Sequence, residues 1–141
     1  MKFKSRIDKL TQGVILGSIV IMYLPLWGVW NSEMGTGTLL IILFIVGISA
    51  ILLWLLFGTY YVLEDDHLVY HNGPFNGKIP IKSIRKIIKD KTLWVGYRPA
   101  TARKGVIVKY QKYDEIYFSP EDNETFIEAL LKLNPGIEVE E

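Results

Sequence analysis

A stretch of 49 residues, from Leu10 to Gly58, contains a single charged residue, Glu33, and it constrains the fold more than any other feature of the chain. The remaining 92 residues carry the other 30 charged residues. A soluble globular domain distributes its charges along the whole chain, and about a quarter of its residues are charged. The uneven distribution therefore excludes an ordinary soluble protein and predicts a segment that lies within a membrane.

The charge-poor stretch divides into two apolar segments, residues 13–30 and 38–58, on either side of a polar, glycine-rich connection at 31–37. A helix needs about 20 apolar residues to cross a hydrocarbon core of about 30 Å. In lipid, the backbone groups must also be paired within the segment. We therefore predict a transmembrane helical hairpin over residues 13–58. Four aromatic residues close to the ends of the spans are expected at the headgroup level: Trp27, Trp30, Tyr60 and Tyr61.

A cleaved signal peptide is the alternative explanation for the first apolar segment, because four basic residues precede or begin it. The end of this segment, residues 26–30, lacks the small-x-small pattern of a cleavage site. Basic residues flank both ends of the hairpin, whereas the connection at 31–37 has none. The positive-inside rule then predicts a multi-pass protein of the cell membrane. Both termini are expected in the cytoplasm, with residues 1–12 as an N-terminal flank.

Residues 59–137 have the features of one cytoplasmic α+β domain, which is followed by an acidic tail at 138–141. Short β-rich segments alternate with turn signals such as residues 64–66 and 72–74, and this spacing predicts an antiparallel sheet or a partly open barrel. The expected strands cover residues 59–63, 67–71, 75–81, 84–88, 106–110 and 113–118, with one helical turn at 81–84.

A C-terminal amphipathic helix is predicted to cap this sheet. Ser119 is expected at the N-cap, Pro120 at the first helical position and Asp122 as the acid of a capping box. Residues 134–136 would end the helix. The apolar face between these signals comprises Phe126, Ile127, Leu130, Leu131 and Leu133. We expect Leu130 to be buried against the open side of the sheet.

The order of the motifs within residues 58–137 allows a comparison with a known family. These motifs are Gly73-Pro74-Phe75, residues 79–84, Arg98-Pro99-Ala100, residues 104–110 and 112–116, Ser119-Pro120, Phe126-Ile127 and Asn134-Pro135. In this order the chain resembles the bacterial YyaB-like PH domain family. The resemblance implies a pleckstrin-homology plan, a β-meander closed by one C-terminal helix, with two membrane spans before it. It implies no activity and no functional residue.

No residue pattern in the chain indicates catalysis, a cofactor or a metal site. The absence of cysteine excludes thiolate ligands and cysteine nucleophiles. The two histidines, His67 and His71, share one face of a predicted strand but have no third ligand nearby. The nucleotide-binding and hydrolase motifs are missing, and the acidic turn at 64–66 has too few ligands for calcium. We therefore expect no enzyme activity, no cofactor and no metal.

Charge is also unevenly distributed within the domain. Residues 78–112 contain eleven Lys and Arg against Asp90, and residues 113–141 contain nine acids against Lys132. This separation fits either a solvated sheet face balanced by an acidic helix or a surface that meets anionic headgroups or an acidic partner. Five residues of the basic half combine aromatic and basic chemistry, and we take them as the candidate lipid or partner surface: Trp94, Tyr97, Arg98, Arg103 and Lys104.

These features predict a membrane-anchored interaction module, for which two hypotheses stand beside that of an enzyme with an unrecognised site. In the first, the domain binds a protein partner or mediates assembly at the cytoplasmic face. In the second, it senses anionic lipid headgroups. The acidic turn at 64–66 argues against an inositol phosphate at the first hairpin, because like charges repel. The acidic tail and the membrane tether argue against a nucleic-acid partner.

Overall fold

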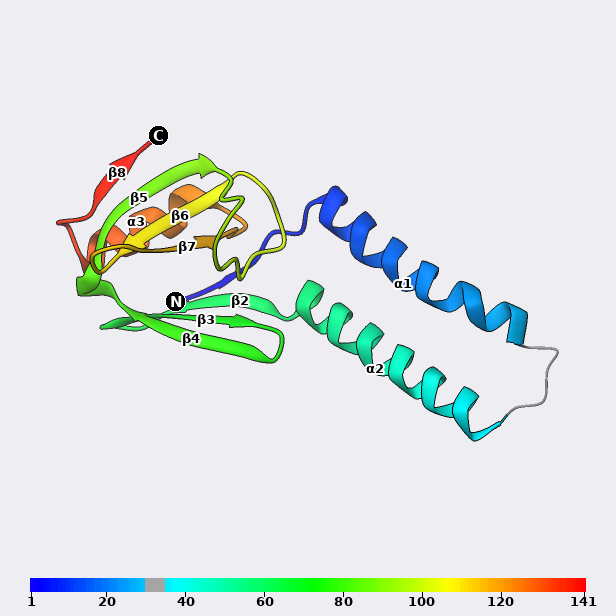
Figure 1. Cartoon of the computed structure of the whole chain (residues 1–141). Coiled ribbons are helices and arrows are strands. Elements are labelled where there is room, and N and C mark those ends of the chain that lie inside the picture. Colours follow the sequence, from blue (N-terminus) through cyan, green and yellow to red (C-terminus); the bar gives the residue numbers. More distant parts are fainter. Residues whose placement is uncertain (30–34) are drawn as a thin grey trace.

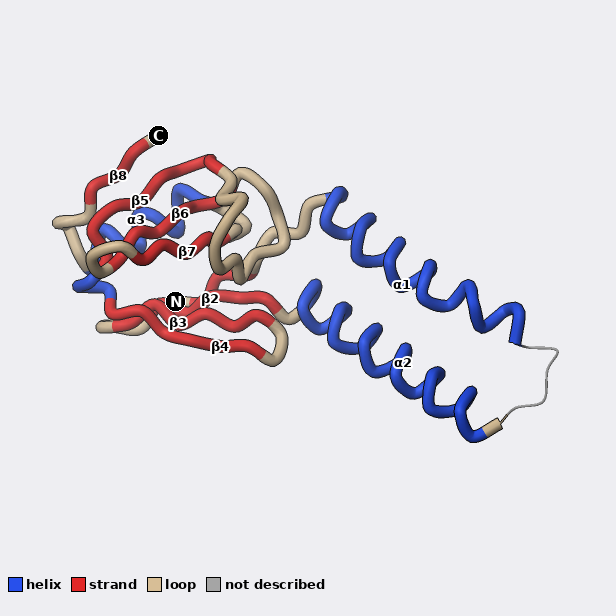
Figure 2. Tube along the Cα trace, in the orientation of Figure 1, coloured by secondary structure: helices blue, strands red, loops and turns tan. Residues whose placement is uncertain are grey.

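The computed structural model describes residues 1–29 and 35–141, which form a pair of long helices and an α+β domain (Figure 1, Figure 2). Trp30 and most of the predicted connection at 31–37 lie outside the described residues. Both helices leave the domain on the same side, and the domain lies wholly at one end of the hairpin (Figure 1). The predicted fold class, two long apolar helices with an α+β domain, is therefore confirmed.

The two helices match the predicted apolar segments. Helix α1 spans Lys9–Val29 and helix α2 spans Thr36–Phe57, with 21 and 22 residues. At 1.5 Å per residue they are about 32 and 33 Å long, which suffices to cross a hydrocarbon core. No residue of α1 is buried, and α2 buries Ile45, Ser49 and Leu56. Such an exposed apolar surface is unstable in water and suits contact with lipid.

Each helix is joined to the domain through a short, well-bonded segment. Asp8 precedes α1, and its carboxylate Oδ1 accepts a hydrogen bond of 2.7 Å from the backbone N–H of Thr11, as an N-cap does. Gly58 alone separates α2 from the strand that follows it, and its N–H donates to the carbonyl of Trp54 at 2.7 Å. A side chain at Gly58 would meet the indole of Trp54, so this junction requires glycine.

The first sheet contains β1 (Lys2–Lys4), β2 (Thr59–Leu63), β3 (His67–Asn72) and β4 (Phe75–Pro80) in this order, all antiparallel. Strand β1 was not predicted, since the sequence analysis treated residues 1–12 as a flank. A three-residue strand with one apolar side chain, Phe3, is too short to show the period of two that identifies strands.

The pairing of β1 with β2 places the helical hairpin inside the domain's own topology. Lys4 lies opposite Tyr60. The connection between these two neighbouring strands contains both long helices, α1 and α2. Removal of a signal peptide would delete β1 together with α1. The position of β1 thus argues against the signal-peptide alternative.

The second sheet follows a 3-10 turn, η1 (Ile81–Ser83), and has the order β7-β6-β5-β8. Its strands are β5 (Ile84–Lys91), β6 (Gly105–Tyr110), β7 (Asp114–Phe118) and β8 (Glu138–Glu140). Strand β8 pairs parallel with β5, whereas the other pairs are antiparallel. The six predicted strands and the helical turn are confirmed. Residues 138–140 form a strand, although they were predicted to belong to an acidic tail.

The core lies between the two sheets and helix α3 (Asn123–Leu133), and the described strands do not close into a barrel. Phe126 and Leu130 are fully buried, so the predicted burial of Leu130 is confirmed. The ring of Phe126 lies 5.3 Å from that of Phe3 and 6.0 Å from that of Phe118. Leu133, which the sequence analysis assigned to the apolar face, is 42 % exposed.

The predicted N-cap of this helix is wrong. Asp122, and not Ser119, caps α3, and its Oδ1 accepts from the backbone N–H groups of Glu124 and Thr125. Ser119 is fully buried three residues earlier, where its hydroxyl bonds to other chain segments. Both residue types are good N-caps, and the local sequence does not distinguish between them.

Tyr61 also departs from expectation. It is fully buried between the sheets, with its ring 4.9 Å from that of Phe118, and does not reach the headgroup level. Its neighbour Tyr60 points to the other face of β2 and stacks on His71 at 4.5 Å. The two tyrosines separate because successive side chains of a strand face opposite sides.

Candidate functional site

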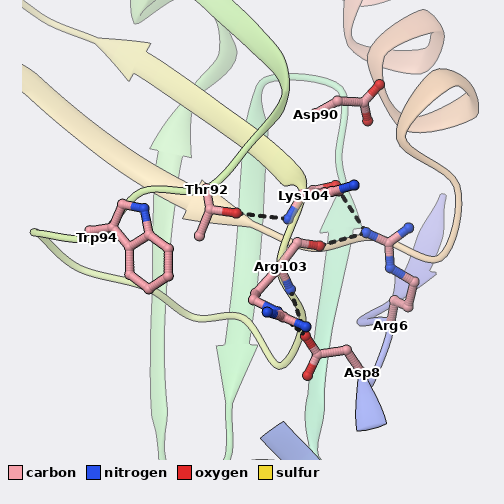
Figure 3. A pocket seen from close by; sticks show the side chains of 7 residues that line it. All are labelled: Arg6, Asp8, Asp90, Thr92, Trp94, Arg103 and Lys104. Carbon is pink, nitrogen blue, oxygen red and sulfur yellow. Dashed lines mark hydrogen bonds and ion pairs between the residues drawn. The ribbon is translucent and has the colours of Figure 1, made fainter. Parts of the chain in front are cut away.

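A pocket of about 750 Å³ opens where the segment before α1 meets the loop between β5 and β6 (Figure 3). The N-terminal segment is held there by a bridge between Ile7 and Thr101 and by a hydrogen bond from the Asp8 N–H to the Thr101 carbonyl. The pocket is lined by Arg6, Asp8, Asp90, Thr92, Trp94, Arg103 and Lys104.

Asp8 connects this pocket to the start of α1. Its Oδ1 caps α1, while its Oδ2 accepts hydrogen bonds from the backbone N–H of Arg103 at 3.2 Å and from Arg103 Nε at 3.0 Å. Desolvation opposes ionisation of Asp8, but the bonds from Thr11 and Arg103 outweigh it and lower its pKa from 3.8 to about 2. Asp8 is therefore ionised at neutral pH and fixes the loop to the start of α1.

Two further cations line the pocket without an acidic partner among the described residues. Arg6 Nη2 donates to the carbonyls of Arg103 at 2.8 Å and Lys104 at 2.9 Å, so its charge is not neutralised by a carboxylate. The Lys104 side chain takes part in no ion pair within the described parts of the chain. The Lys104 backbone has a φ of 53° and is held by its N–H bond to Thr92 Oγ1. Together with Arg103, the lining thus carries three cations against the carboxylates of Asp8 and Asp90, an excess of one positive charge.

The tip of the same loop is apolar and exposed. Trp94 and Val95 are 77 % and 82 % exposed. The loop lies on the side of the domain from which the helices extend, next to the start of α1 (Figure 1). An exposed indole beside cations is the composition that suits a water–lipid boundary.

The structure brings together only part of the predicted surface. Trp94, Arg103 and Lys104 line the pocket. Tyr97 instead bridges to Ile116 of β7, and Arg98 lies over the ring of Tyr117 at 5.1 Å, with its Nε buried and unbonded. The Tyr97 backbone and the Arg98 side chain thus attach the loop to β7, whereas the Tyr97 ring lies 5.7 Å from that of Tyr70 on β3.

Four lining residues were missed by the sequence analysis. Arg6 and Asp8 are about a hundred residues away from the loop they contact, and short basic flanks are common beside membrane spans. Asp90 stands in a left-handed backbone conformation with φ of 56°, and its carboxylate accepts from Asn123 Nδ2 at 2.7 Å. Neither contact leaves a local pattern in the sequence.

Three lysines of β5 are paired with acidic residues from the end of the chain. Lys89 pairs with Glu124 of α3 at 2.7 Å, and Lys86 and Lys91 pair with Glu140 of β8 at 2.5 and 3.6 Å. The ion pairs along β5 fit the interpretation of a sheet face balanced by acidic residues.

Comparison with known proteins identifies the family. The model of the bacterial PH domain matches residues 59–134, from the start of β2 to the end of α3. The uncharacterized protein YyaB of Bacillus subtilis (strain 168) is 30 % identical over 91 residues, which cover 64 % of this chain and 62 % of that relative. The chain thus spans less than two thirds of the relative's length, and no solved structure matches it. With more than half of its length matched by the family model, the chain belongs to the bacterial PH domain family.

Proposed function

We propose that this protein is a membrane-mounted PH-like module whose β5–β6 loop contacts anionic lipid headgroups. The observation that carries the proposal is the attachment of this loop to the first turn of α1 through Asp8 and Arg103. The charge pattern and composition alone favoured a protein partner over a lipid. For this surface, its position at the base of the helices favours the headgroup.

Distance to the bilayer supports this choice. Asp8 is the residue before a membrane-length helix, so it lies where a span enters the headgroup layer, and Arg103 is 3.0 Å from it. A Lys or Arg near an anionic leaflet gains about 1 kcal/mol, but only within a Debye length of about 8 Å. The pocket cations satisfy that condition if both helices cross the bilayer.

A second loop on the same side adds an apolar contact. The turn between β3 and β4 abuts the end of α2, since a side chain at Gly73 would meet Leu55. Phe75, directly after this turn, is 57 % exposed. Phe75 and the loop tip at Trp94 would then flank the helices and hold the domain against the interface.

The orientation of the hairpin can be tested by cysteine labelling, because the chain has no cysteine of its own. We expect both termini and the domain in the cytoplasm, as the basic flanks indicate. Gly35→Cys, at the exposed N-cap of α2, should react with an impermeant thiol reagent in intact cells. Tyr113 lies in the turn after β6 and is 84 % exposed, and Tyr113→Cys should react only after lysis. The reverse pattern would place the domain outside the cell.

Headgroup contact can be measured with a fluorophore on Val95→Cys in the full chain, reconstituted in nanodiscs. We expect the probe to report a less polar environment in anionic than in zwitterionic discs, with the difference reduced at high salt. Lys104→Gln should shift the contact equilibrium by about fivefold, corresponding to about 1 kcal/mol for one charge.

Lys112→Gln is the matched control, because it removes the same charge from the turn between β6 and β7, at the end of the domain remote from the helices (Figure 1). It should leave the fluorescence unchanged. Identical spectra in both lipid compositions, or equal effects of the two substitutions, would refute the headgroup contact.

A further inference from the structure

The outer edge of β5 holds the short acidic strand β8. The two strands run parallel, with Lys86 opposite Glu138, Ile87 opposite Val139 and Ile88 opposite Glu140. This edge lies on the side of the domain remote from the helices (Figure 1). We propose that it is a docking edge for an extended acidic segment of a partner protein, and that β8 is the intramolecular occupant which such a segment displaces. This site is separate from the headgroup surface and goes beyond the function proposed for it.

Ion pairs at the surface hold β8 in place. Lys86 Nζ lies 3.4 Å from Glu138 Oε1 and 2.5 Å from Glu140 Oε2, and Lys91 Nζ lies 3.6 Å from Glu140 Oε1. The side chains of Glu138 and Glu140 are 72 % and 44 % exposed. Exposed ion pairs contribute little to stability and weaken further in salt. These contacts select for negative charge without fastening the strand firmly.

Apolar burial does not fasten β8 either. Val139 is 40 % exposed, and the pairing extends over three residues. Ile137, directly before the strand, is buried in the core and would stay in place when β8 leaves. A short element with little buried apolar surface opens at low free-energy cost. The strand can therefore leave the edge while the rest of the domain remains folded.

Departure of β8 would expose a prepared binding edge. Ile87 is fully buried in the core, so β5 keeps its position and presents the unpaired backbone groups of residues 86–88. Such an edge accepts another strand through main-chain hydrogen bonds. Lys86 and Lys91 stand beside it, whereas Lys89 is occupied by Glu124 of α3. The edge thus favours a parallel segment with acidic residues at alternate positions, the pattern that Glu138 and Glu140 show.

The test uses the full chain in nanodiscs, either intact or ending at Ile137, and a fluorescent peptide of residues 134–141 as the probe. We expect saturable binding to the shortened chain, observed as fluorescence anisotropy, and binding to the intact chain that is weaker by about tenfold because β8 occupies the edge. Glu140→Lys in the intact chain should restore part of the binding. Glu128→Lys, an equal charge change on α3, should not.

A charge exchange identifies the edge. The peptide carrying Glu138→Lys and Glu140→Lys should not bind to the shortened chain. It should bind to a shortened chain that carries Lys86→Glu and Lys91→Glu. Lack of saturable peptide binding up to the millimolar range, or equal binding to the intact and shortened chains, would overturn the proposal.

A second copy of the chain as the occupant would also overturn the proposal of a separate partner. Copies carrying Ile88→Cys are mixed with copies carrying Glu140→Cys, two positions that face each other in the β5–β8 ladder. Disulfide-linked dimers between the two kinds of copy would show that tails are exchanged between neighbours. We expect no such dimers, and an efficient disulfide when both cysteines are in one chain.

Discussion

Phe126→Ala should lower the free energy of unfolding of the domain by about 3–5 kcal/mol, the range for truncating a buried phenylalanine. The ring is fully buried and contacts three aromatic residues from different strands: Phe3 of β1, Tyr61 of β2 and Phe118 of β7. No small rearrangement of one element could fill the cavity, because the lining belongs to both sheets. Chemical denaturation of the full chain in detergent micelles, followed by the aromatic circular dichroism of the domain, measures the loss.

Leu133→Ala is the matched control, since Leu133 lies in the same helix but is 42 % exposed. Apart from the small change in helix propensity, Leu133→Ala should alter the free energy of unfolding by no more than about 0.5 kcal/mol. Equal midpoints for Phe126→Ala and the unmodified chain would mean that α3 does not cover the core as the structure has it.

The elements that could be predicted from the sequence are those whose signals are local. The two spans follow from charge-free length, and the strands from β2 to β7 follow from β-rich segments between turn residues such as Gly73. The helix α3 follows from its apolar period. Strands β1 and β8 escaped prediction because each has three residues and is defined by its partner, not by its own composition.

The candidate site was predictable to a similar extent. Trp94, Arg103 and Lys104 lie within one loop, so their shared chemistry is visible in the sequence. The contribution of Arg6 and Asp8 depends on the return of the chain through the hairpin. Arg98 shares the composition of the surface but packs on Tyr117. Composition therefore located the loop, whereas only the tertiary structure shows which of its side chains face the pocket.

The nested position of the hairpin has a mechanical consequence for the domain. Helix α2 passes into β2 through one residue, and α1 is joined to β1 by a segment bonded to Thr59, Thr101 and Ser119. Neither helix can tilt independently without disturbing a strand of the first sheet or the pocket at Asp8. The domain is thus held in a defined orientation, unlike a domain on a flexible linker.

Ser5, in the segment before α1, belongs to a buried hydroxyl cluster that secures this attachment. Ser5 Oγ lies 2.8 Å from Ser119 Oγ, 2.9 Å from Thr101 Oγ1 and 3.1 Å from the hydroxyl of Tyr61. Tyr61 also donates to the carbonyl of Pro99 at 2.7 Å. Buried hydroxyls are costly unless paired, and here each is paired with a different segment of the chain.

Ser119→Ala should destabilise the domain by about 2–4 kcal/mol through this cluster. The substitution leaves the buried backbone N–H groups of Thr101 and Ala102 without the Ser119 Oγ that accepts from them at 3.1 and 3.2 Å. Each unpaired buried donor costs about 1–3 kcal/mol. Denaturation of the full chain in micelles measures the change, with Asp122→Ala as the comparison, since loss of the true N-cap should cost about 0.5–2 kcal/mol.

A double-mutant cycle separates the cluster from a capping role. Ser5→Ala and Ser119→Ala remove two hydroxyls that bond to each other, so the double variant should be more stable than the sum of the single losses predicts, by about 0.5 kcal/mol or more. Asp122→Ala, which acts at the start of α3, should add to Ser5→Ala without coupling. If the stability losses of Ser5→Ala and Ser119→Ala were strictly additive, the hydroxyl cluster would not be what attaches the first helix to the domain.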